Sequence, residues 1–233
     1  MSDIVLMPVY NEGGTVSAVL DSVREHFDGE ILIVNDGSTD DTNAALAARD
    51  DITVIAHPVN MGYGRALAEG FAIARTREAR RVVTMDCDGQ HEPAHILQFL
   101  GELESGADIV SGSRYLPRSA AVGEPPTNRR EINARVSAEI NSVTGWGITD
   151  AFCGFKAYRL AALEGIALCE PGYAMPLELW AKVHLAGMVV REMPVERIYF
   201  DHDRSFGHDL DDPEVRFAYY MRVWAKALEG HPC

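Results

Sequence analysis

The sequence lacks any apolar stretch long enough to cross a membrane, because no window approaches the length of about 18 to 20 apolar residues that a spanning helix needs. Its first residues, MSDIVLMPVYNE, carry an acid at position 3 and a short apolar run, so they do not predict a secretory signal peptide. We therefore expect a cytoplasmic protein, and a peripheral position at the cytoplasmic membrane stays open.

Positive charge and cysteine are both scarce. The chain has 21 lysine and arginine residues against 35 aspartate and glutamate residues, and its net charge of -14 disfavours non-specific binding to nucleic acid or to an anionic membrane surface. The four cysteines, Cys87, Cys153, Cys169 and Cys233, show neither the paired spacing of a zinc site nor a disulfide framework. We expect all four to be packing residues.

The sequence is rich in alternating strand-like and helix-like segments. Apolar runs predict strands at residues 3–9, 30–36, 51–57, 80–86, 107–113 and 188–195. Helical spacing predicts helices at residues 14–27, 40–50, 64–78, 93–106, 130–145, 175–187 and 213–228. In the last of these, residues 215, 218, 219, 222, 223 and 226 form a mixed stripe that we expect to pack on the domain. Apolar strands joined by helices indicate an α/β fold with a mostly parallel sheet covered on both faces.

Polar, acidic and glycine residues follow five of the predicted strands. They lie at residues 8–12, 35–42, 57–64, 86–91 and 111–115. In open parallel sheets, ligands bind outside the carboxyl ends of the strands, where these stretches meet. This concentration predicts a binding site at one edge of the sheet.

Two aspartates one residue apart, Asp86 and Asp88, follow the strand-like run that begins at residue 80. If the chain turns at Gly89, both carboxylates can converge on one divalent cation, and oxygen ligands favour Mg²⁺ or Mn²⁺ over zinc. Such a metal completes its shell with water and substrate phosphates, which points to a nucleotide diphosphate. The alternative is an Asx turn at Asp88 that leads into a helix near Pro93.

Two other positions at the predicted edge suit a nucleoside. The Asp36 carboxylate can accept hydrogen bonds from a base or a ribose, whereas Ser38, Thr39 and Asp40 read as a turn and helix cap. Tyr10 offers a ring on which a base can stack. Taken singly, Tyr10 is more often structural, whereas a structural role explains Asp36 less easily because capping does not require it.

Taken together, six ordered stretches resemble the inverting family 2 glycosyltransferases with a GT-A fold, most of all the dolichyl-phosphate mannose synthase and polyprenyl-phosphate glycosyltransferase branch. These stretches are MPVYNEGGTV, IVNDGSTDDT, NMGYGRAL, MDCDGQHEP, SGSRY and TDAFCGFKAYR. The resemblance implies a metal-dependent enzyme that moves a hexose from a nucleotide diphosphate sugar, of the GDP-mannose or UDP-glucose type, to a polyprenyl or dolichyl phosphate. It implies one GT-A domain over residues 1–233, with a nucleotide-sugar half at 1–112 and an acceptor half at 113–233.

The same resemblance assigns roles to individual residues. The nucleotide would be bound by Pro8, Val9, Tyr10, Glu12, Asp36, Gly64, Asp86 and Cys87. The metal, Mg²⁺ or Mn²⁺, would be held by Asp86, Asp88 and Gln90, and Asp88 would also be catalytic. The acceptor phosphate would be held by Arg114, Arg130 and Arg204, of which Arg114 and Arg130 are also expected at the catalytic centre. For Arg129, a paired surface arginine is the favoured interpretation.

The chemistry of the acceptor decides what else the enzyme needs. A hydroxyl acceptor must lose a proton to a general base, and Asp150 resembles the position of that base in other family 2 enzymes. The alternative is that Asp150 orients its own loop. Glu178 is a weaker candidate for the acceptor side, where a solvated helix position is the competing interpretation, and either His202 or His208 is a candidate additional metal ligand. The late loop lacks the lysine usual in the lipid-phosphate branch.

Three hypotheses follow. The first is transfer to a polyprenyl phosphate, with or without a membrane-anchoring partner in place of a membrane span of its own. The second keeps the donor chemistry with a soluble hydroxyl acceptor, which the acidic composition and the absent lysine favour. The third is a non-catalytic nucleotide-sugar-binding protein. The base, the sugar and the oligomeric state stay open.

Overall fold

The computed structural model describes residues 2–123, 127–198 and 208–230, with the side chains of residues 208 and 209 excepted. The strands are β1 (Asp3–Val9), β2 (Glu30–Asn35), β3 (Thr53–Ala56), β4 (Arg81–Thr84), β5 (Ile109–Ser113), β6 (Ala121–Val122), β7 (Lys156–Arg159), β8 (Val190–Pro194) and β9 (Arg197–Ile198). The α-helices are α1 (Val16–His26), α2 (Thr42–Ala47), α3 (Tyr63–Thr76), α4 (Ile96–Glu104), α5 (Thr127–Thr144), α6 (Met175–Leu185) and α7 (Pro213–Leu228). Short 3-10 turns lie at η1 (Pro93–His95), η2 (Leu160–Leu163) and η3 (His208–Asp211).

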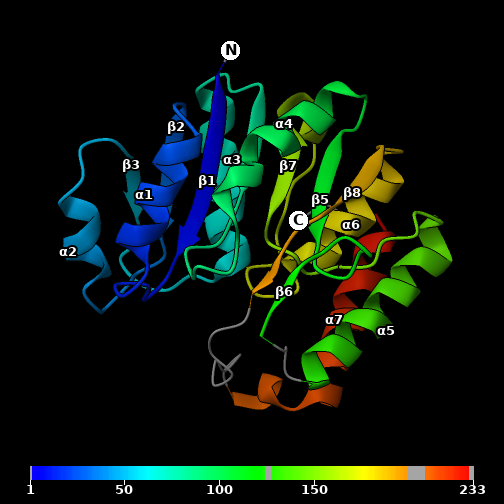
Figure 1. Ribbon diagram of the computed structural model, residues 1–233. Helices are drawn as coiled ribbons and strands as arrows, with labels where there is room; N and C mark the ends of the chain where they lie inside the picture. The colour runs from blue at the N-terminus through cyan, green and yellow to red at the C-terminus, as the bar shows by residue number, and fades with distance from the viewer. Residues whose placement is uncertain (1, 124–126, 199–207, 231–233) are drawn as a thin grey trace.

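Seven strands form the central sheet, in the order β3-β2-β1-β4-β7-β5-β8 (Figure 1). All neighbouring pairs are parallel except those of β7, which runs antiparallel to β4 and β5. The six predicted strands and the mostly parallel sheet are therefore confirmed, and β7 is an addition. A second, two-stranded sheet pairs β6 with β9.

Helices cover both faces of the sheet (Figure 1). On one face, α3, α5, α6 and α7 pack over alternate strand residues such as Leu6 and Val34. On the other, α1, α2 and α4 pack over the residues between them, such as Val5 and Ile33. Strands buried on both faces explain why the β1 and β2 sequences are continuous apolar runs rather than alternating ones.

The sheet opens at the carboxyl end of β1. The β1–β4 pairing ends at Leu6 opposite Thr84, whereas the β1–β2 pairing continues to Val9 opposite Asn35. Pro8, which has no N–H to donate, lies beyond the last residue paired with β4. The chain after β4 therefore leaves the sheet at Met85 and Asp86 and makes room for a pocket.

The structure corrects two expectations. The inner face of α7 is formed by Arg216, Tyr220, Trp224 and Ala227. The predicted stripe was therefore wrong at residues 215, 218, 222 and 226, which are exposed, whereas Tyr219 and Val223 do pack against the core. Cys87 and Cys153 are buried free thiols, but Cys169 is disulfide-bonded and is not a simple packing residue. Within the described ranges, no helix is long and apolar enough to span a bilayer.

Candidate active site

A pocket of about 320 Å³ lies outside the carboxyl ends of the strands, where the sequence predicted it. The charged side chains that line it are segregated along the chain. Among the described residues, the lining acids are Glu12, Asp36, Asp86 and Asp88. The lining cations are Arg114, Arg129, Lys156 and Arg216. We call these two sets the acidic wall and the basic wall.

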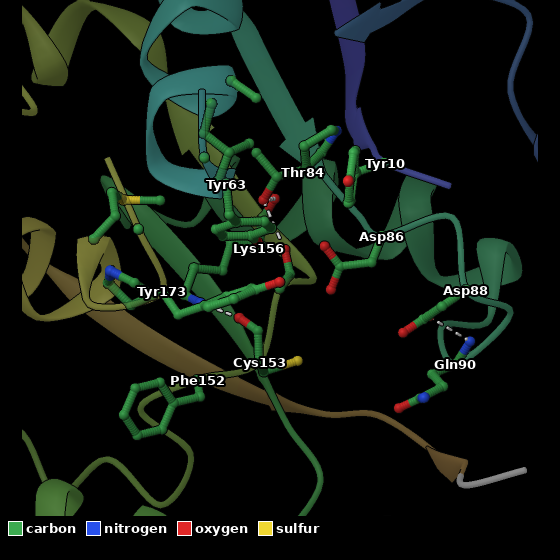
Figure 2. A pocket seen from close by; sticks show the side chains of 18 of the residues that line it. Tyr10, Tyr63, Thr84, Asp86, Asp88, Gln90, Phe152, Cys153, Lys156 and Tyr173 are labelled. Carbon is green, nitrogen blue, oxygen red and sulfur yellow. Dashed lines mark hydrogen bonds between the residues drawn. The ribbon is translucent and has the colours of Figure 1, made fainter. Parts of the chain in front are cut away.

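Asp86 is one of the residues that line the pocket (Figure 2). Its side chain is 30% exposed, and a Cβ on Gly154 would stand only 2.3 Å from its Oδ2 atom. Burial and the Asp86 charge raise the pKa of the neighbouring Tyr63. Gly154 is therefore required by contact with the carboxylate, which the sequence motif did not reveal.

His91 holds the main chain of Asp86 in place through a hydrogen bond. Its Nδ1 accepts the backbone N–H of Asp86 at 3.1 Å, and its ring stacks on Phe155 with 5.3 Å between centroids. Burial lowers the pKa of His91, and the accepting role of Nδ1 leaves the proton of the neutral ring on Nε2. This role was not predicted, because His91 lies outside the two-aspartate motif.

Asp88 and Gln90 lie beside Asp86 on the turn at Gly89 (Figure 2). Asp88 Oδ1 accepts the Gln90 backbone N–H at 3.0 Å, and Gly89 has a φ of 74°. The Asx turn posed as an alternative is thus present, and the same aspartate also lines the pocket. The two interpretations are compatible, since one carboxylate has several acceptor positions.

The donor set fits a hard divalent cation. Two carboxylates and one amide side chain share a wall of the pocket, and oxygen ligands of this kind suit Mg²⁺ or Mn²⁺. Within the described part of the chain, no three histidine, cysteine, aspartate or glutamate side chains are grouped so that they would hold a metal ion. Any cation here would therefore need further oxygens from water or from a bound diphosphate.

Asp36 is almost fully buried and organises the loop after β3. Its carboxylate accepts the backbone N–H groups of Met61 and Gly62 at 2.8 Å each. It also contacts His57 Nδ1 at 2.6 Å, and His57 Nε2 lies 2.9 Å from Glu69 on α3. Burial opposes protonation of His57, but hydrogen bonds to both carboxylates outweigh it and raise the pKa of His57.

Of the other residues predicted to bind the nucleotide, all except Gly64 line the pocket. Pro8, Val9, Tyr10 and Glu12 line the pocket, with the Tyr10 side chain 43% exposed. Cys87 also lines it, although the residue is only 1% exposed and its side chain packs in the core.

Gly64, which was predicted to bind the nucleotide, lies outside the pocket lining. Its N–H donates to the Pro171 carbonyl at 2.8 Å, and a Cβ there would lie 2.1 Å from the Glu170 carbonyl oxygen. This glycine is needed for close packing of α3 against the loop before α6.

Asp150 lies behind the pocket, where it holds Arg114. Arg114 donates from Nε and Nη2 to the two Asp150 carboxylate oxygens at 2.7 and 3.0 Å, and its backbone N–H donates at 3.2 Å. Burial would raise the pKa of Asp150, but the Arg114 charge outweighs burial and lowers it. Asp150 is fully buried and outside the lining, so the structure favours the orienting alternative over the general base.

The arginines of the TNRR stretch are placed in the reverse of the expected order. Arg129 lines the pocket, whereas Arg130 is exposed and lies outside the lining. The reason is helical geometry, because the two residues are consecutive in the first turn of α5 and point in different directions. Arg204 and His202 lie outside the described residues, as does the side chain of His208.

Glu178 is buried in α6 rather than solvated or facing the acceptor side. It accepts the backbone N–H groups of Cys169 and Glu170 at 2.8 Å each and pairs with Lys182 at 2.8 Å. It therefore fixes the loop that packs on Gly64.

Lys156 and Arg216 are pocket residues that the sequence reasoning missed. Lys156 is the first residue of β7 and lines the pocket (Figure 2). Its Nζ atom donates to the Cys153 carbonyl and lies 5.4 Å from the centre of the Trp180 ring. Burial lowers the pKa of Lys156, while the charges of Asp150 and Asp86 oppose that shift. Lys156 directly follows the stretch TDAFCGF, and no pattern in the sequence predicted that it would line the pocket.

The likeness to known proteins agrees with this geometry. A family model described as Glycosyl transferase family 2 matches residues 4–166, which include the whole acidic wall. The chain belongs to glycosyl transferase family 2. The predictions of the family and of a glycosyltransferase are confirmed.

Individual relatives of this family 2 chain are similar over most of their length. Polyprenol monophosphomannose synthase of Mycolicibacterium smegmatis is 32% identical over 201 residues, covering 82% of this chain and 76% of the relative. Undecaprenyl-phosphate mannosyltransferase of Micrococcus luteus is 29% identical over 203 residues, covering 84% and 83%. These names agree with the polyprenyl-phosphate branch that the motifs resemble.

Solved structures share the fold. Glucosyl-3-phosphoglycerate synthase from Mycobacterium tuberculosis, in complex with Mn²⁺, UDP and glucosyl-3-phosphoglycerate, matches with a TM-score of 0.73 at 19% identity, covering all of this chain and 81% of that one. The GT-A fold expected for this family 2 chain is thereby confirmed.

Proposed function

We propose that this glycosyltransferase moves a hexose from a nucleotide diphosphate sugar to the phosphate of a polyprenyl phosphate, with a divalent cation bound at Asp86 and Asp88. The donor is of the GDP-mannose or UDP-glucose type. The names of two relatives, a polyprenol monophosphomannose synthase and an undecaprenyl-phosphate mannosyltransferase, support this acceptor class.

The acidic wall would bind the donor. Tyr10 offers an exposed ring to the base, and Asp36, held by His57 and two backbone N–H groups, offers its remaining acceptor capacity to the nucleoside. Asp86 and Asp88 would hold Mg²⁺ or Mn²⁺, with Gln90 beside them. When bound, such an ion acts as a Lewis acid that stabilises negative charge on the departing diphosphate.

The basic wall would bind the acceptor. A phosphate is already anionic at neutral pH, so it needs cationic positioning rather than a general base. Arg114 meets this need because its guanidinium is held rigidly by Asp150 at the edge of the pocket. Arg129 and Lys156 lie on the same wall. Their positive charge would reduce the electrostatic repulsion between the two anionic substrates.

One observation carries the choice of a phosphate over a hydroxyl acceptor. The candidate base, Asp150, is fully buried, engaged on both oxygens by Arg114 and outside the pocket lining. A carboxylate so engaged is a poor proton acceptor, since protonation would break the ion pair. The same pair fixes the orientation of the Arg114 guanidinium at the pocket.

The test is a transfer assay with purified protein. GDP-mannose and UDP-glucose are each supplied with Mn²⁺ or EDTA, together with detergent-solubilised undecaprenyl phosphate or with 3-phosphoglycerate. We expect sugar transfer to undecaprenyl phosphate with one donor, loss of transfer in EDTA, and a fall of at least about 100-fold in kcat/KM for Asp88→Asn. Asp41→Asn, a change in an exposed residue outside the pocket lining, is the matched control and should be unaffected. Transfer to the soluble hydroxyl acceptor alone would overturn the proposal.

A further inference from the structure

Asp36 lies two strands away from the proposed metal pair along the carboxyl edge of the sheet (Figure 1). It follows β2, whereas Asp86 follows β4, and β1 runs between these strands. Neighbouring strands lie about 4.8 Å apart, so the ends of β2 and β4 are separated by about 10 Å. A nucleotide whose diphosphate is bound at Asp86 would therefore extend its nucleoside toward Asp36. A base that stacks on Tyr10, which follows β1, would have Asp36 at its edge.

Donors within the chain occupy most of the Asp36 carboxylate. Oδ1 contacts His57 Nδ1 at 2.6 Å and accepts the Met61 N–H at 2.8 Å. Oδ2 accepts the Gly62 N–H at 2.8 Å. A carboxylate has about four acceptor positions, two on each oxygen. Among the donors in the described part of the chain, these three therefore leave one acceptor position, and it lies on Oδ2.

The position that His57 fills on Oδ1 is held by a true donor. His57 Nδ1 faces the Asp36 carboxylate, and Nε2 faces the Glu69 carboxylate at 2.9 Å. An ionised carboxylate can only accept, so both ring nitrogens must carry a proton for both hydrogen bonds to form. With the imidazolium and the Met61 N–H both donating to it, Oδ1 has no acceptor position left for a ligand.

Access to Asp36 is narrow as well. Asp36 lines the pocket, yet its side chain is only 4% exposed. The next residue, Gly37, has a φ of 72°, and a Cβ there would overlap the main chain of Val59 and Asn60. The loop after β3 is thus closed down on the end of β2. A ligand can approach the carboxylate from one side only, where a single N–H donor meets the free position on Oδ2.

Nucleobases differ in the donors that they offer to such a carboxylate. Uracil and thymine present one N–H, at N3, between two carbonyls. Guanine presents two adjoining donors, N1–H and the N2 amine, and it pairs with a carboxylate by using both oxygens. At Asp36, one of the two guanine donors would be left unpaired inside the pocket, which weakens binding. Cytosine and adenine place an unprotonated ring nitrogen beside their amine, and the carboxylate would repel it. Asn60, which also lines the pocket, can donate to a carbonyl of uracil or of guanine and does not discriminate between them.

We propose that Asp36 selects a base with a single ring N–H, so that the sugar donor is a uridine or thymidine diphosphate sugar rather than a guanosine diphosphate sugar. This inference rests on the proposed function, in which the acidic wall binds the donor, and it names the base that the proposed function leaves open. His57 determines the specificity, because its Nδ1–H fills the position on Oδ1 that the second guanine donor would need.

Isothermal titration in Mn²⁺ tests this selection without requiring catalysis. The full chain is titrated with UDP, dTDP, GDP, inosine diphosphate, which lacks the N2 amine, and 3-methyluridine diphosphate, which lacks the N3–H. We expect UDP to bind at least about tenfold more tightly than GDP and than its 3-methyl analogue, and inosine diphosphate to bind more tightly than GDP. The UDP and dTDP titrations tell the two nucleotides of the proposed class apart. Tighter binding of GDP than of both inosine diphosphate and UDP would overturn the proposal, as would equal binding of UDP and its 3-methyl analogue.

A variant of His57 isolates the residue that determines the specificity. His57→Leu removes a donor from Oδ1, so Asp36 can accept both guanine donors. The affinity for UDP should fall, and the ratio of UDP affinity to GDP affinity should fall by at least about tenfold. His26→Leu is the matched control, since His26 lies outside the pocket lining and should leave the ratio unchanged. An unchanged ratio in a folded His57→Leu protein overturns the role of His57. If that variant folds poorly, the ligand series with the wild-type protein still decides.

The proposed function and the base selection fail in different ways. If UDP or dTDP is selected but undecaprenyl phosphate receives no sugar from the corresponding nucleotide sugars, the proposed function is wrong and the base selection stands. If sugar is transferred from GDP-mannose and GDP binds more tightly than UDP, the base selection is wrong and the function stands. If no nucleotide diphosphate binds in Mn²⁺, the donor site itself is wrong, and both are overturned.

Discussion

The acidic wall and the basic wall are built in different ways. Every lining acid in the described part of the chain comes from the first 88 residues and lies just after β1, β2 or β4, at the carboxyl edge of the sheet. The lining cations begin at Arg114 and come from the end of β5, from α5, from β7 and from α7. The acidic wall is thus a set of strand ends, whereas the basic wall is assembled from elements far apart in the sequence.

This difference follows from what each wall would hold. A cation and a nucleoside need oxygen ligands at fixed spacing, which the ends of adjacent parallel strands provide directly. An anionic acceptor needs cations around a cavity wide enough for a second substrate, and such a ring requires several helices. At Gly154 the chain that leads to the basic wall contacts the acidic wall, whereas Asp150 supports the basic wall alone.

The largest effect is expected at Gly154, where the chain of the basic wall touches Asp86 of the acidic wall. In Gly154→Ala, the new Cβ would stand 2.3 Å from Asp86 Oδ2, so the carboxylate must move. A displaced metal ligand and a misplaced donor should together lower kcat/KM by about 1000-fold. Steady-state transfer assays measure this loss.

The matched control is Gly101→Ala, within α4. A Cβ at Gly101 meets nothing within 4 Å, and alanine is the better helix former, so this variant should keep full activity and gain about 0.5–1 kcal/mol in the free energy of unfolding. Wild-type activity in Gly154→Ala would mean that Asp86 tolerates displacement and does not hold the metal.

The contrast between the acidic wall and the basic wall also explains how much of the site could be predicted from the sequence. The strands after which the acids lie are long apolar runs, so their ends, and with them Asp86 and Asp88, were readable from the sequence. β7 was missed because it has four residues, two of them cationic, and Arg216 was missed because a helix pattern places an arginine on the solvent side. His57 and Gly154 act through contacts with residues distant in the sequence, which periodicity cannot reveal.

A second prediction concerns Asp150, the residue that supports the basic wall. In Asp150→Asn, the Arg114 guanidinium keeps its buried position but loses the carboxylate that compensates it, which should lower the free energy of unfolding by about 3 kcal/mol. For a chain of this size, the Tm should fall by about 6–12 °C. Thermal unfolding measures the change.

The contribution of Asp150 to the free energy of unfolding should depend on pH in a defined direction. Because the pKa of Asp150 is lowered in the folded protein, its stabilising contribution is present above the ordinary aspartate value of about 3.9 and is lost as the pH falls through the folded-state pKa. Wild type and Asp150→Asn should therefore converge at low pH. Asp21→Asn, which breaks an exposed pair with Arg49, should cost less than about 1 kcal/mol. A similar small cost for Asp150→Asn would show that Arg114 does not depend on it.

The smallest effect is expected at His57, which supports the acidic wall alone. In His57→Gln, one amide can replace at most part of the bridge between Asp36 and Glu69, so the orientation of Asp36 loosens while the metal pair is untouched. Loss of a charge-assisted hydrogen bond worth about 1.5 kcal/mol should weaken nucleotide diphosphate binding by about tenfold, with little change in kcat. Isothermal titration measures the affinity.

The pH profile separates this positioning role from a general loss of structure. The pKa of His57 is raised in the folded protein, so its bridge is complete below the ordinary histidine value of about 6.5 and is lost as the pH rises through the folded-state pKa. Wild-type nucleotide affinity should fall over that interval, and His57→Gln should remove the dependence. His26→Gln, whose ring contacts only the Ser22 carbonyl among the hydrogen bonds found in the described chain, should keep the wild-type profile. An unchanged profile in His57→Gln would mean that Asp36 is positioned by the Met61 and Gly62 N–H groups without help from the histidine, and that the acidic wall is rigid by its backbone alone.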